Sequence, residues 1–173
     1  MKLVHAVMAL ATLLAALGGA WVTGLRVNLS ASIPLGLYHE RSTDPRGFSR
    51  GRIVMVCLPS SVARFARDRG YLPRGTCHNG AMAAGKVITA VSGDTVRVGA
   101  DGITVNGSLL SGSVPLLRER SGRALPQLAR GTYLVPAGAV WLGSRSRFGF
   151  DSRYFGAVPV SAIRGTIDPV WTP

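Results

Sequence analysis

The sequence predicts a mainly β domain, in the form of a coiled sheet or barrel, attached to one N-terminal membrane helix. The 173-residue chain has a single long apolar run, 4–25, in which His5 is the only titratable residue. The remainder contains several short β-branched runs separated by Gly and Pro. No internal repeat is visible in the sequence, and the length suits one anchored domain with a modest core.

The apolar run fits a membrane-spanning helix. As a helix, its 22 residues would cover roughly 33 Å, about the thickness of the hydrocarbon core of a bilayer. Lys2 precedes the run, which favours an N-terminus left in the cytoplasm and a following domain on the outer side. The alternative is a cleaved signal peptide, with the small residues at 16–20 as its cleavage region. We therefore divide the chain into an N-terminal membrane anchor, 1–26, and an exported domain, 27–173.

Beyond the anchor, the pattern of apolar residues predicts mostly strands. A polar, turn-rich segment at 39–51 is expected to form a surface loop. A short helix opened by serine caps is expected at 60–73, and 108–131 lacks a clear period and is expected to leave the sheet. Strands are expected at 52–59, 86–91, 132–136, 139–144, 154–160 and 163–167. A β-hairpin is expected over 95–107, with its turn at Asp101-Gly102.

The charge balance does not indicate a nucleic-acid-binding protein. Lys and Arg number 20 and Asp and Glu 8, which gives a net charge of +12. The basic residues form no stripe, however, and no motif combines basic and aromatic residues for stacking on bases. A basic surface near anionic lipid headgroups explains the charge with fewer assumptions. We expect no nucleic acid as a partner.

The two cysteines, Cys57 and Cys77, both lie in the expected exported domain. Their spacing does not suit a metal site, which needs closer and more numerous ligands. We expect neither a metal nor a cofactor. In an oxidising compartment the pair indicates one disulfide, worth about 3 kcal/mol for a loop of this size. A cysteine nucleophile is the alternative.

Lysine usage singles out one residue. Only Lys2 and Lys86 are lysines among the 20 basic residues, and Lys86 lies in an apolar stretch. Arginine cannot lose its proton in a protein, whereas a desolvated lysine can. A lysine acting as a base at neutral pH needs its pKa lowered by about three units, which an apolar strand can supply. The alternative is a lysine that reaches solvent from a strand edge.

The stretch at 28–38 contains candidate nucleophiles. Pro34 biases the chain toward an extended conformation, in which Ser30 and Ser32 would share one side. A serine and a lysine together are one known solution for acyl transfer. A competing Ser–His–Asp site would need His39 or His78, and neither lies in a context that suggests a buried imidazole.

Near the C-terminus, Asp151 and Arg153 lie two residues apart in an expected strand, flanked by aromatic residues. They are expected to share one face of that strand. One interpretation is a structural ion pair at the edge of the core. The other is that the pair orients a Ser–Lys site.

Three stretches together resemble the type I signal peptidase family. They are SASIP at 30–34, GKVITAVSGD at 85–94 and DSRYFGAVP at 151–159, in this order after an apolar helix. The similarity is closer to the conjugative-transfer branch, the TraF-type peptidases, whose pattern N-x-[ST]-x-S-x-P-x-G-L-Y matches 28–38. The resemblance covers nearly the whole chain and implies a signal-peptidase-like coiled β-sheet or barrel on one transmembrane helix.

The resemblance implies roles for five residues. Ser32 matches the nucleophile and Lys86 the general base. The hydroxyl of Ser30 matches the group that helps the backbone N–H of Ser32 to form the oxyanion hole. Asp151 and Arg153 match a C-terminal box that supports the region of the active-site lysine. No metal takes part in this chemistry.

Further matches and departures refine the comparison. The resemblance implies that Cys57 and Cys77 are the disulfide pair of the periplasmic domain. Ile33 leads directly into Pro34, whereas ordinary signal peptidases have Met and one further residue before Pro, and this favours the TraF branch. Gly149 stands where many relatives have Ser. A hydroxyl that could hydrogen-bond the lysine is therefore expected to be missing.

Together these features predict a Ser–Lys endopeptidase of the bacterial inner membrane, single-pass, with its catalytic domain in the periplasm. The resemblance implies that it matures a pilin precursor for conjugative transfer, by hydrolysis or by cyclisation. Its partners would be the inner membrane and a membrane-bound precursor protein. The alternatives are a housekeeping signal peptidase and a non-catalytic assembly factor with the same fold. The short chain argues against the first, and the retained Ser32 and Lys86 argue against the second.

Overall fold

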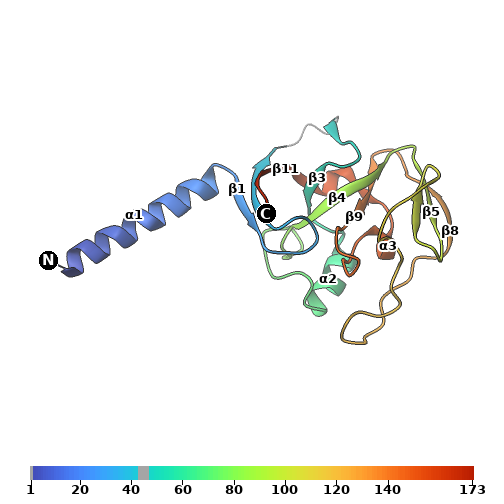
Figure 1. Cartoon of the computed structure of the whole chain (residues 1–173), viewed down its shortest axis with the longest axis horizontal. Coiled ribbons are helices and arrows are strands. Elements are labelled where there is room, and N and C mark those ends of the chain that lie inside the picture. Colours follow the sequence, from blue (N-terminus) through green and yellow to red (C-terminus); the bar gives the residue numbers. More distant parts are fainter. Residues whose placement is uncertain (1, 43–46) are drawn as a thin grey trace.

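The computed structural model describes residues 2–42 and 47–173, except for the side chains at positions 16, 17, 20 and 21. A long helix stands apart from a body made mostly of strands (Figure 1), so the mainly β prediction is confirmed. The elements, in chain order, are α1 (Lys2–Val22), β1 (Leu25–Asn28), β2 (Gly36–Arg41), β3 (Ile53–Val56), α2 (Ser60–Asp68), β4 (Ala84–Val91), β5 (Thr95–Val98), β6 (Ile103–Val105), β7 (Ser108–Leu109), β8 (Gly131–Leu134), β9 (Ala139–Gly143), α3 (Ser152–Phe155), β10 (Val158–Pro159), η2 (Val160–Ala162) and β11 (Ile163–Trp171).

The strands form two antiparallel sheets. The larger has the order β1-β2-β11-β3-β4-β9-β10, and the smaller has the order β7-β6-β5-β8. The last strand, β11, lies between β2 and β3, where Thr166 is opposite both Arg41 and Val54. The C-terminus therefore joins the N-terminal hairpin to the rest of the large sheet. Register shifts in the pairing of β11 with β3 and of β4 with β9 are of the kind that bend a sheet.

Three apolar clusters hold these layers together. The first packs the centre of the large sheet against α2 and contains Val54, Val56, Leu58, Ala63, Ile88, Val140, Leu142 and Val158. The second joins the two sheets and contains Ala90, Val96, Val98, Ile103, Val105, Val135 and Trp141. The third holds the chain between β1 and β2 and contains Ile33, Tyr38 and Ile167. Alternating burial along β4 explains why its sequence predicted a strand so clearly.

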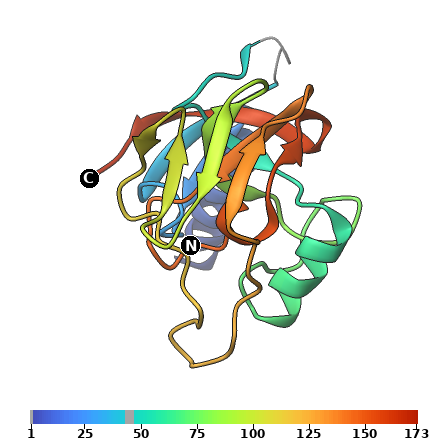
Figure 2. The same cartoon turned by 90° about the vertical axis from the view of Figure 1, so that its right-hand side faces the viewer.

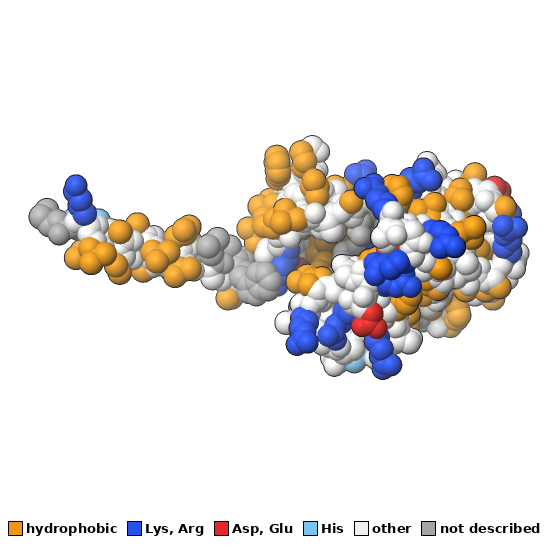
Figure 3. Space-filling view, turned by 90° about the horizontal axis from the view of Figure 1, so that it is seen from below, with side chains coloured by type: hydrophobic (Ala, Val, Ile, Leu, Met, Phe, Trp, Pro, Cys, Tyr) orange, Lys and Arg blue, Asp and Glu red, His pale blue; other side chains and the backbone are white. Residues whose placement is uncertain are grey.

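The predicted N-terminal helix is present as α1, and its apolar side chains are exposed (Figure 3). Within the described part of the chain, however, no helix combines the length and the apolar character needed to cross a membrane. Met1 and the side chains at 16, 17, 20 and 21 of the predicted anchor lie outside the described residues. The membrane-spanning part of the prediction is therefore not confirmed. Figure 3 also shows the Lys and Arg side chains of one face spread over several separate places.

Most predicted strands are confirmed, with bounds shifted by a few residues. They correspond to β3, β4, β8, β9 and β11. The hairpin is formed by β5 and β6, and its turn is closed by a hydrogen bond from the N–H of Gly99 to the carbonyl of Gly102 at 2.9 Å. The periodicity of apolar residues was sufficient for β3, β4 and β9 because these strands have buried positions along their length. Most of β8, by contrast, is exposed.

Other local predictions are wrong or only partly right. The helix at 60–73 is present as α2, but Pro59 is its N-cap and no side chain caps it. Of the strand predicted at 154–160, the first two residues belong to α3 and only β10 pairs in the sheet. Of the loop predicted at 39–51, residues 39–41 belong to β2 and 43–46 lie outside the described residues.

Residues 110–130 form a long loop that lies outside both sheets (Figure 2). Glu119 fixes this loop to the end of α2. Its carboxylate is 3.0 Å from Arg69 Nη1, accepts a hydrogen bond from the Tyr71 hydroxyl and pairs with Arg123. Burial, together with the hydrogen bond to Glu119, raises the pKa of Tyr71 to about 12. Of the segment predicted to leave the sheet, 108–131, the ends therefore belong to β7 and β8, and only the part between them leaves the sheets. The contacts of Glu119 help to anchor that part to the body.

Candidate active site

Ser32 lies in a turn at 30–33, which Asn28 at the end of β1 holds in shape. Asn28 Nδ2 donates to the carbonyls of Ser30 and Pro34 at 2.8 Å each and of Ile33 at 3.3 Å. Asn28 Oδ1 accepts hydrogen bonds from the N–H and the hydroxyl of Ser30. The expectation that Ser30 and Ser32 share one side of an extended segment is therefore wrong. One amide side chain thus binds the backbone at 30, 33 and 34 and holds the turn in a shape that is not extended.

Ile33 fixes the turn against β4. Its side chain is buried with Tyr38, whose hydroxyl donates to the carbonyl of Pro34 at 2.7 Å. A Cβ atom at Gly85 would lie 3.0 Å from Ile33 Cδ1, so the absence of a side chain there lets Ile33 lie close on the strand. This contact brings Ser32 beside the next residue of β4.

That next residue is Lys86, on a strand inside the large sheet. Lys86 is opposite Val54 of β3 and only 4% exposed. Its Nζ lies 3.3 Å from Ser32 Oγ and 2.8 Å from Ser144 Oγ. The interpretation of a lysine that reaches solvent from a strand edge is wrong, because β4 is paired on both sides. The structure thus brings together the two residues predicted as nucleophile and base.

The surroundings of Lys86 shift its protonation equilibrium toward the neutral form. Burial lowers the pKa of Lys86 from 10.5 to about 8. The negative charge of Asp151 acts in the opposite direction, and the positive charge of Arg153 acts in the same direction as burial. With a pKa of about 8, roughly a tenth of the molecules carry a neutral lysine at pH 7. The shift has the size and direction that the sequence argument requires of a general base.

Asp151 and Arg153 form a buried ion pair at a helix end rather than on a strand. Asp151 is the N-cap of α3, and its side chain accepts the N–H of Arg153. Arg153 Nε and Nη2 lie 2.7 and 2.9 Å from the two carboxylate oxygens. The same guanidinium donates to the carbonyls of Gly149, Arg147 and Ser146 at 2.8, 3.1 and 3.3 Å. The pair therefore closes the loop between β9 and α3, whose first residues touch Lys86 and Ser32.

The remaining polar candidates lie in different settings. Ser30 is exposed, and its hydroxyl donates to Asn28 Oδ1 at 2.8 Å, so it is bound within its own turn. Its role in an oxyanion hole stays a prediction. His39 lies in β2, opposite Leu25. Among the described residues, the hydrogen-bond partner of the Ser32 hydroxyl is Lys86 and not a histidine.

Cys57 and Cys77 form a disulfide, with their Cα atoms 5.6 Å apart. The alternative of a free cysteine nucleophile is therefore wrong. Both cysteines are buried beside Ala83, which is the residue before β4. The bond joins the segment after β3 to the segment before β4 and so helps to fix the strand that carries Lys86.

Residues that were not among the sequence-based candidates also hold the pair together. Ser144 Oγ accepts a hydrogen bond from Lys86 Nζ, and the N–H of Arg145 donates to the carbonyl of Ser32 at 2.8 Å. Asn28 stands at the first position of the 28–38 pattern, which was a signal for its importance. No local pattern pointed to Ser144, because its contact with Lys86 spans 58 positions.

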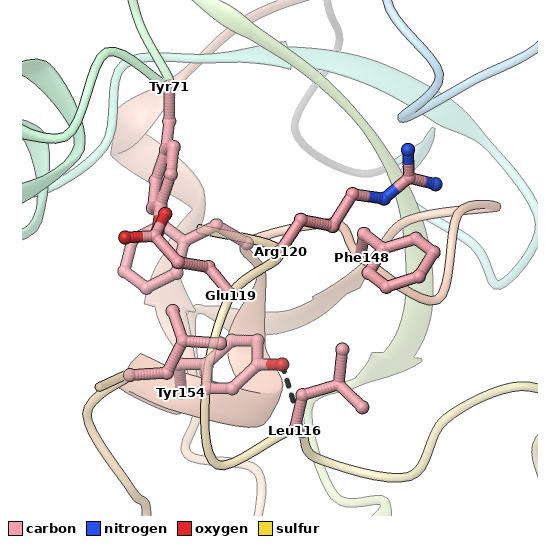
Figure 4. A pocket seen from close by; sticks show the side chains of 9 residues that line it. Tyr71, Leu116, Glu119, Arg120, Phe148 and Tyr154 are labelled. Atoms are coloured by element: carbon pink, nitrogen blue, oxygen red, sulfur yellow. Dashed lines mark hydrogen bonds between the residues drawn. The ribbon is translucent and has the colours of Figure 1, made fainter. Parts of the chain in front are cut away.

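Two hollows border the loop between β9 and α3. One, of about 220 Å³, is lined by residues that include Thr89, Trp141, Ser144 and Asp151. The other, of about 190 Å³, is lined by Gly149 together with Tyr71, Leu116, Glu119, Arg120, Phe148 and Tyr154. Figure 4 shows the second hollow, where the Tyr154 hydroxyl accepts the N–H of Leu116 at 3.1 Å. The residues that line the two hollows do not include Ser32 or Lys86.

The chain is similar to known proteins over almost its full length. The family described as "Signal peptidase, peptidase S26" matches residues 1–172. A plasmid transfer protein TraF of Escherichia coli is 39% identical over 164 residues, which are 94% of this chain and 90% of that protein. A probable conjugal transfer protein TraF of Sinorhizobium fredii (strain NBRC 101917 / NGR234) is 38% identical over 157 residues, 90% of this chain and 81% of that protein.

Among solved structures, a signal peptidase I of Enterococcus faecalis V583 is 19% identical, with a TM-score of 0.40 over 74% of this chain and 100% of that one. The resemblance drawn from the motifs is confirmed by the family match and by the TraF relatives. This chain belongs to the signal peptidase family, peptidase S26.

Proposed function

We propose that the chain is a serine endopeptidase in which Ser32 is the nucleophile and Lys86 the general base. The observation that supports this most is the 3.3 Å separation between the buried Nζ of Lys86 and Oγ of Ser32. A buried lysine with a pKa of about 8 supplies a neutral amine near physiological pH. Two serine hydroxyls, those of Ser32 and Ser144, lie within reach of this amine, and Ser32, which stands in the 28–38 pattern, is the one that we propose it activates.

In the proposed reaction, Lys86 Nζ takes the hydroxyl proton while Ser32 Oγ attacks the carbonyl carbon of the scissile bond. The backbone N–H of Ser32 binds the resulting oxyanion, with the hydroxyl of Ser30 after it rotates away from Asn28. When the C–N bond breaks, protonated Lys86 gives its proton to the leaving amine, and an acyl ester remains on Ser32. Water activated by Lys86 then hydrolyses the ester. An amine that attacks in place of water would instead join two chain ends.

Asp151 and Arg153 support this site without taking part in bond changes. Their ion pair fixes the loop between β9 and α3, and both charges act on the pKa of Lys86. Loss of either partner would leave a buried, unpaired charge. We expect such variants to lose structure around Lys86 as well as activity.

We further propose that α1 anchors the chain in the bacterial inner membrane, with the body in the periplasm. The large apolar side chains that the structure describes in α1 are exposed, and the net charge of +12 suits a surface beside anionic headgroups. The strand β1 begins three residues after α1 ends, and the Ser32 turn follows β1 directly. A substrate held in the same membrane would therefore meet the nucleophile near the membrane surface.

The proposed substrate is a membrane-bound precursor protein, specifically a pilin precursor in conjugative transfer. Two of the relatives are named for plasmid or conjugal transfer, which supports this choice over a housekeeping signal peptidase. The contact between Ser32 and Lys86, with the pKa of Lys86 lowered to about 8, argues against a non-catalytic assembly factor. Such a factor would have no need of a buried lysine beside a serine.

The test uses the full chain in membranes together with a membrane-bound pilin precursor. Ser32→Ala and Lys86→Arg should each abolish processing, because alanine lacks the hydroxyl and arginine keeps the charge but cannot act as a base. Ser61→Ala, on the exposed surface of α2, is the matched control and should process normally. Processing by Ser32→Ala at the rate of the unaltered chain would overturn the proposal.

A second arm tests the anchor. Ten flexible residues inserted after Thr23, between α1 and β1, should sharply reduce cleavage of the membrane-bound precursor. Hydrolysis of a short soluble peptide should change little, because the insertion leaves β1 and the Ser32 turn intact. Equal losses of activity on both substrates would contradict the proposal that α1 places Ser32 at the membrane surface for cleavage of a membrane-bound precursor.

A further inference from the structure

We propose that Ser144 is a positioning residue that aims Lys86 at Ser32, so that the hydroxyl expected at position 149 is supplied from position 144. This inference rests on the proposed function of Ser32 and Lys86. Ser144 follows directly after β9 and is partly buried. Its hydroxyl oxygen is 2.8 Å from Lys86 Nζ, closer than that of Ser32 at 3.3 Å.

The chemistry of an amine explains why this contact matters. A neutral lysine has two N–H bonds and one lone pair on Nζ, and only the lone pair can take the serine proton. When one N–H is donated to Ser144, rotation of the amine is restricted and the lone pair can point at Ser32. Without the Ser144 hydroxyl, Nζ is free to adopt orientations in which the lone pair points elsewhere, and fewer encounters are productive.

The segment that carries Ser144 also holds the nucleophile. Gly143 is opposite Val87, the residue after Lys86, in the ladder between β9 and β4. The next residue but one, Arg145, donates its N–H to the carbonyl of Ser32 at 2.8 Å. Three consecutive residues, 143–145, therefore fix the strand of the base, the amine of the base and the backbone of the nucleophile. Such an arrangement keeps the distance between Oγ and Nζ constant.

Gly149 explains why the hydroxyl comes from Ser144. The backbone at Gly149 does not have the positive φ that excludes side chains. A Cβ atom there would, however, overlap with Cβ and Oγ of Ser144. The two positions therefore compete for one space beside Lys86. In this chain Ser144 fills that space, and Gly149 leaves it open.

The first test is steady-state hydrolysis of a short soluble peptide by the full chain in detergent. Ser144→Ala should lower kcat about 10- to 100-fold, the equivalent of one charge-assisted hydrogen bond, with KM nearly unchanged. The melting temperature should also stay close to that of the unaltered chain. Ser146→Ala is the matched control, because its hydroxyl accepts the N–H of Phe148 in the same loop and is not a partner of Lys86.

The second test moves the hydroxyl. Gly149→Ser alone should lower both stability and kcat, because the new side chain collides with Ser144. Ser144→Gly alone should lower kcat as Ser144→Ala does. The double variant Ser144→Gly/Gly149→Ser should recover most of the lost kcat, since it returns a hydroxyl to the same space from the other side.

The outcomes separate this inference from the proposed function. Unaltered kcat in Ser144→Ala would overturn the positioning role, and so would a loss that the double variant does not recover. If Ser32→Ala keeps full hydrolysis, the proposed function fails whatever Ser144 does. Loss in both Ser32→Ala and Ser144→Ala, with recovery in the double variant, is the expected result.

Discussion

Replacing Lys86 with methionine removes a buried ammonium group while keeping a long, unbranched side chain. Lys86 is 4% exposed, and burial lowers its pKa from 10.5 to about 8. The pKa of the unfolded chain stays near 10.5, so the unfolded state binds more protons between pH 8 and 10.5. The free energy of unfolding therefore rises with pH across this window. Below pH 8 both states are protonated, and the fold bears the full penalty of the buried charge.

The size of this penalty follows from the two pKa values. At ~1.4 kcal/mol for each pH unit, the interval between 10.5 and about 8 corresponds to about 3 kcal/mol. Lys86→Met should gain this amount relative to the unaltered chain at pH 7. A loss of about 1 kcal/mol is expected at every pH, because Ser144 no longer has Lys86 as a partner. The advantage of the variant should then shrink by about 3 kcal/mol as the pH rises from 7 to beyond 10.5.

The assay is urea denaturation of the full chain in detergent at a series of pH values. Unfolding is monitored by tryptophan fluorescence, since Trp141 is buried in the core. Lys2→Met is the matched control, because Lys2 is the other lysine and is exposed on α1. Because this side chain is exposed, its replacement should change the free energy of unfolding by less than about 0.5 kcal/mol. A stability difference for Lys86→Met that stays constant between pH 7 and 10.5 would refute the reasoning.

Three further predictions concern the pH profile and the scaffold. For the unaltered chain, kcat/KM should rise about tenfold per pH unit up to the Lys86 pKa of about 8 and then level off, as a pH–rate profile would show. Asp94 is buried and bonded to Arg50, which lowers its pKa, so Asp94→Asn should lose about 2 kcal/mol at pH 7. That loss should fade below pH 4 in urea denaturation. Reduction of the Cys57–Cys77 bond should lower the free energy of unfolding by about 3 kcal/mol.

The sequence was sufficient for elements whose burial follows a simple period. The strand β4 alternates buried and less buried positions, and its one lysine stands out because arginine carries nearly all other positive charge. Lys86 could therefore be singled out before its contacts were known. Ser32 could be chosen as a candidate nucleophile from the short pattern at 28–38. In the structure, Asn28 and Pro34 of this pattern shape the turn that carries Ser32.

Other features depend on contacts that no local pattern encodes. The helix α3 has only four residues and is set by the Asp151 cap and the Arg153 pair, whereas its apolar neighbours suggested a strand. Gly149 led to the expectation that no hydroxyl from this loop hydrogen-bonds Lys86. That expectation was wrong because Ser144 occupies the same space, which the sequence does not show. Both errors concern the loop after β9, where side-chain contacts rather than periodicity decide the conformation.

The site of covalent acylation shows directly whether Ser32 is the nucleophile and whether Lys86 activates it. The full chain in detergent at pH 8.5 is treated with an activated aryl ester, digested and mapped by mass spectrometry. An acyl group is expected on Ser32 in the unaltered chain and in Lys2→Met, and none on Ser32 in Lys86→Met, since the base would be gone while the fold remains. Acylation of Ser32 to the same extent in Lys86→Met, or of a different serine in the unaltered chain, would show that Ser32 and Lys86 do not act as nucleophile and base.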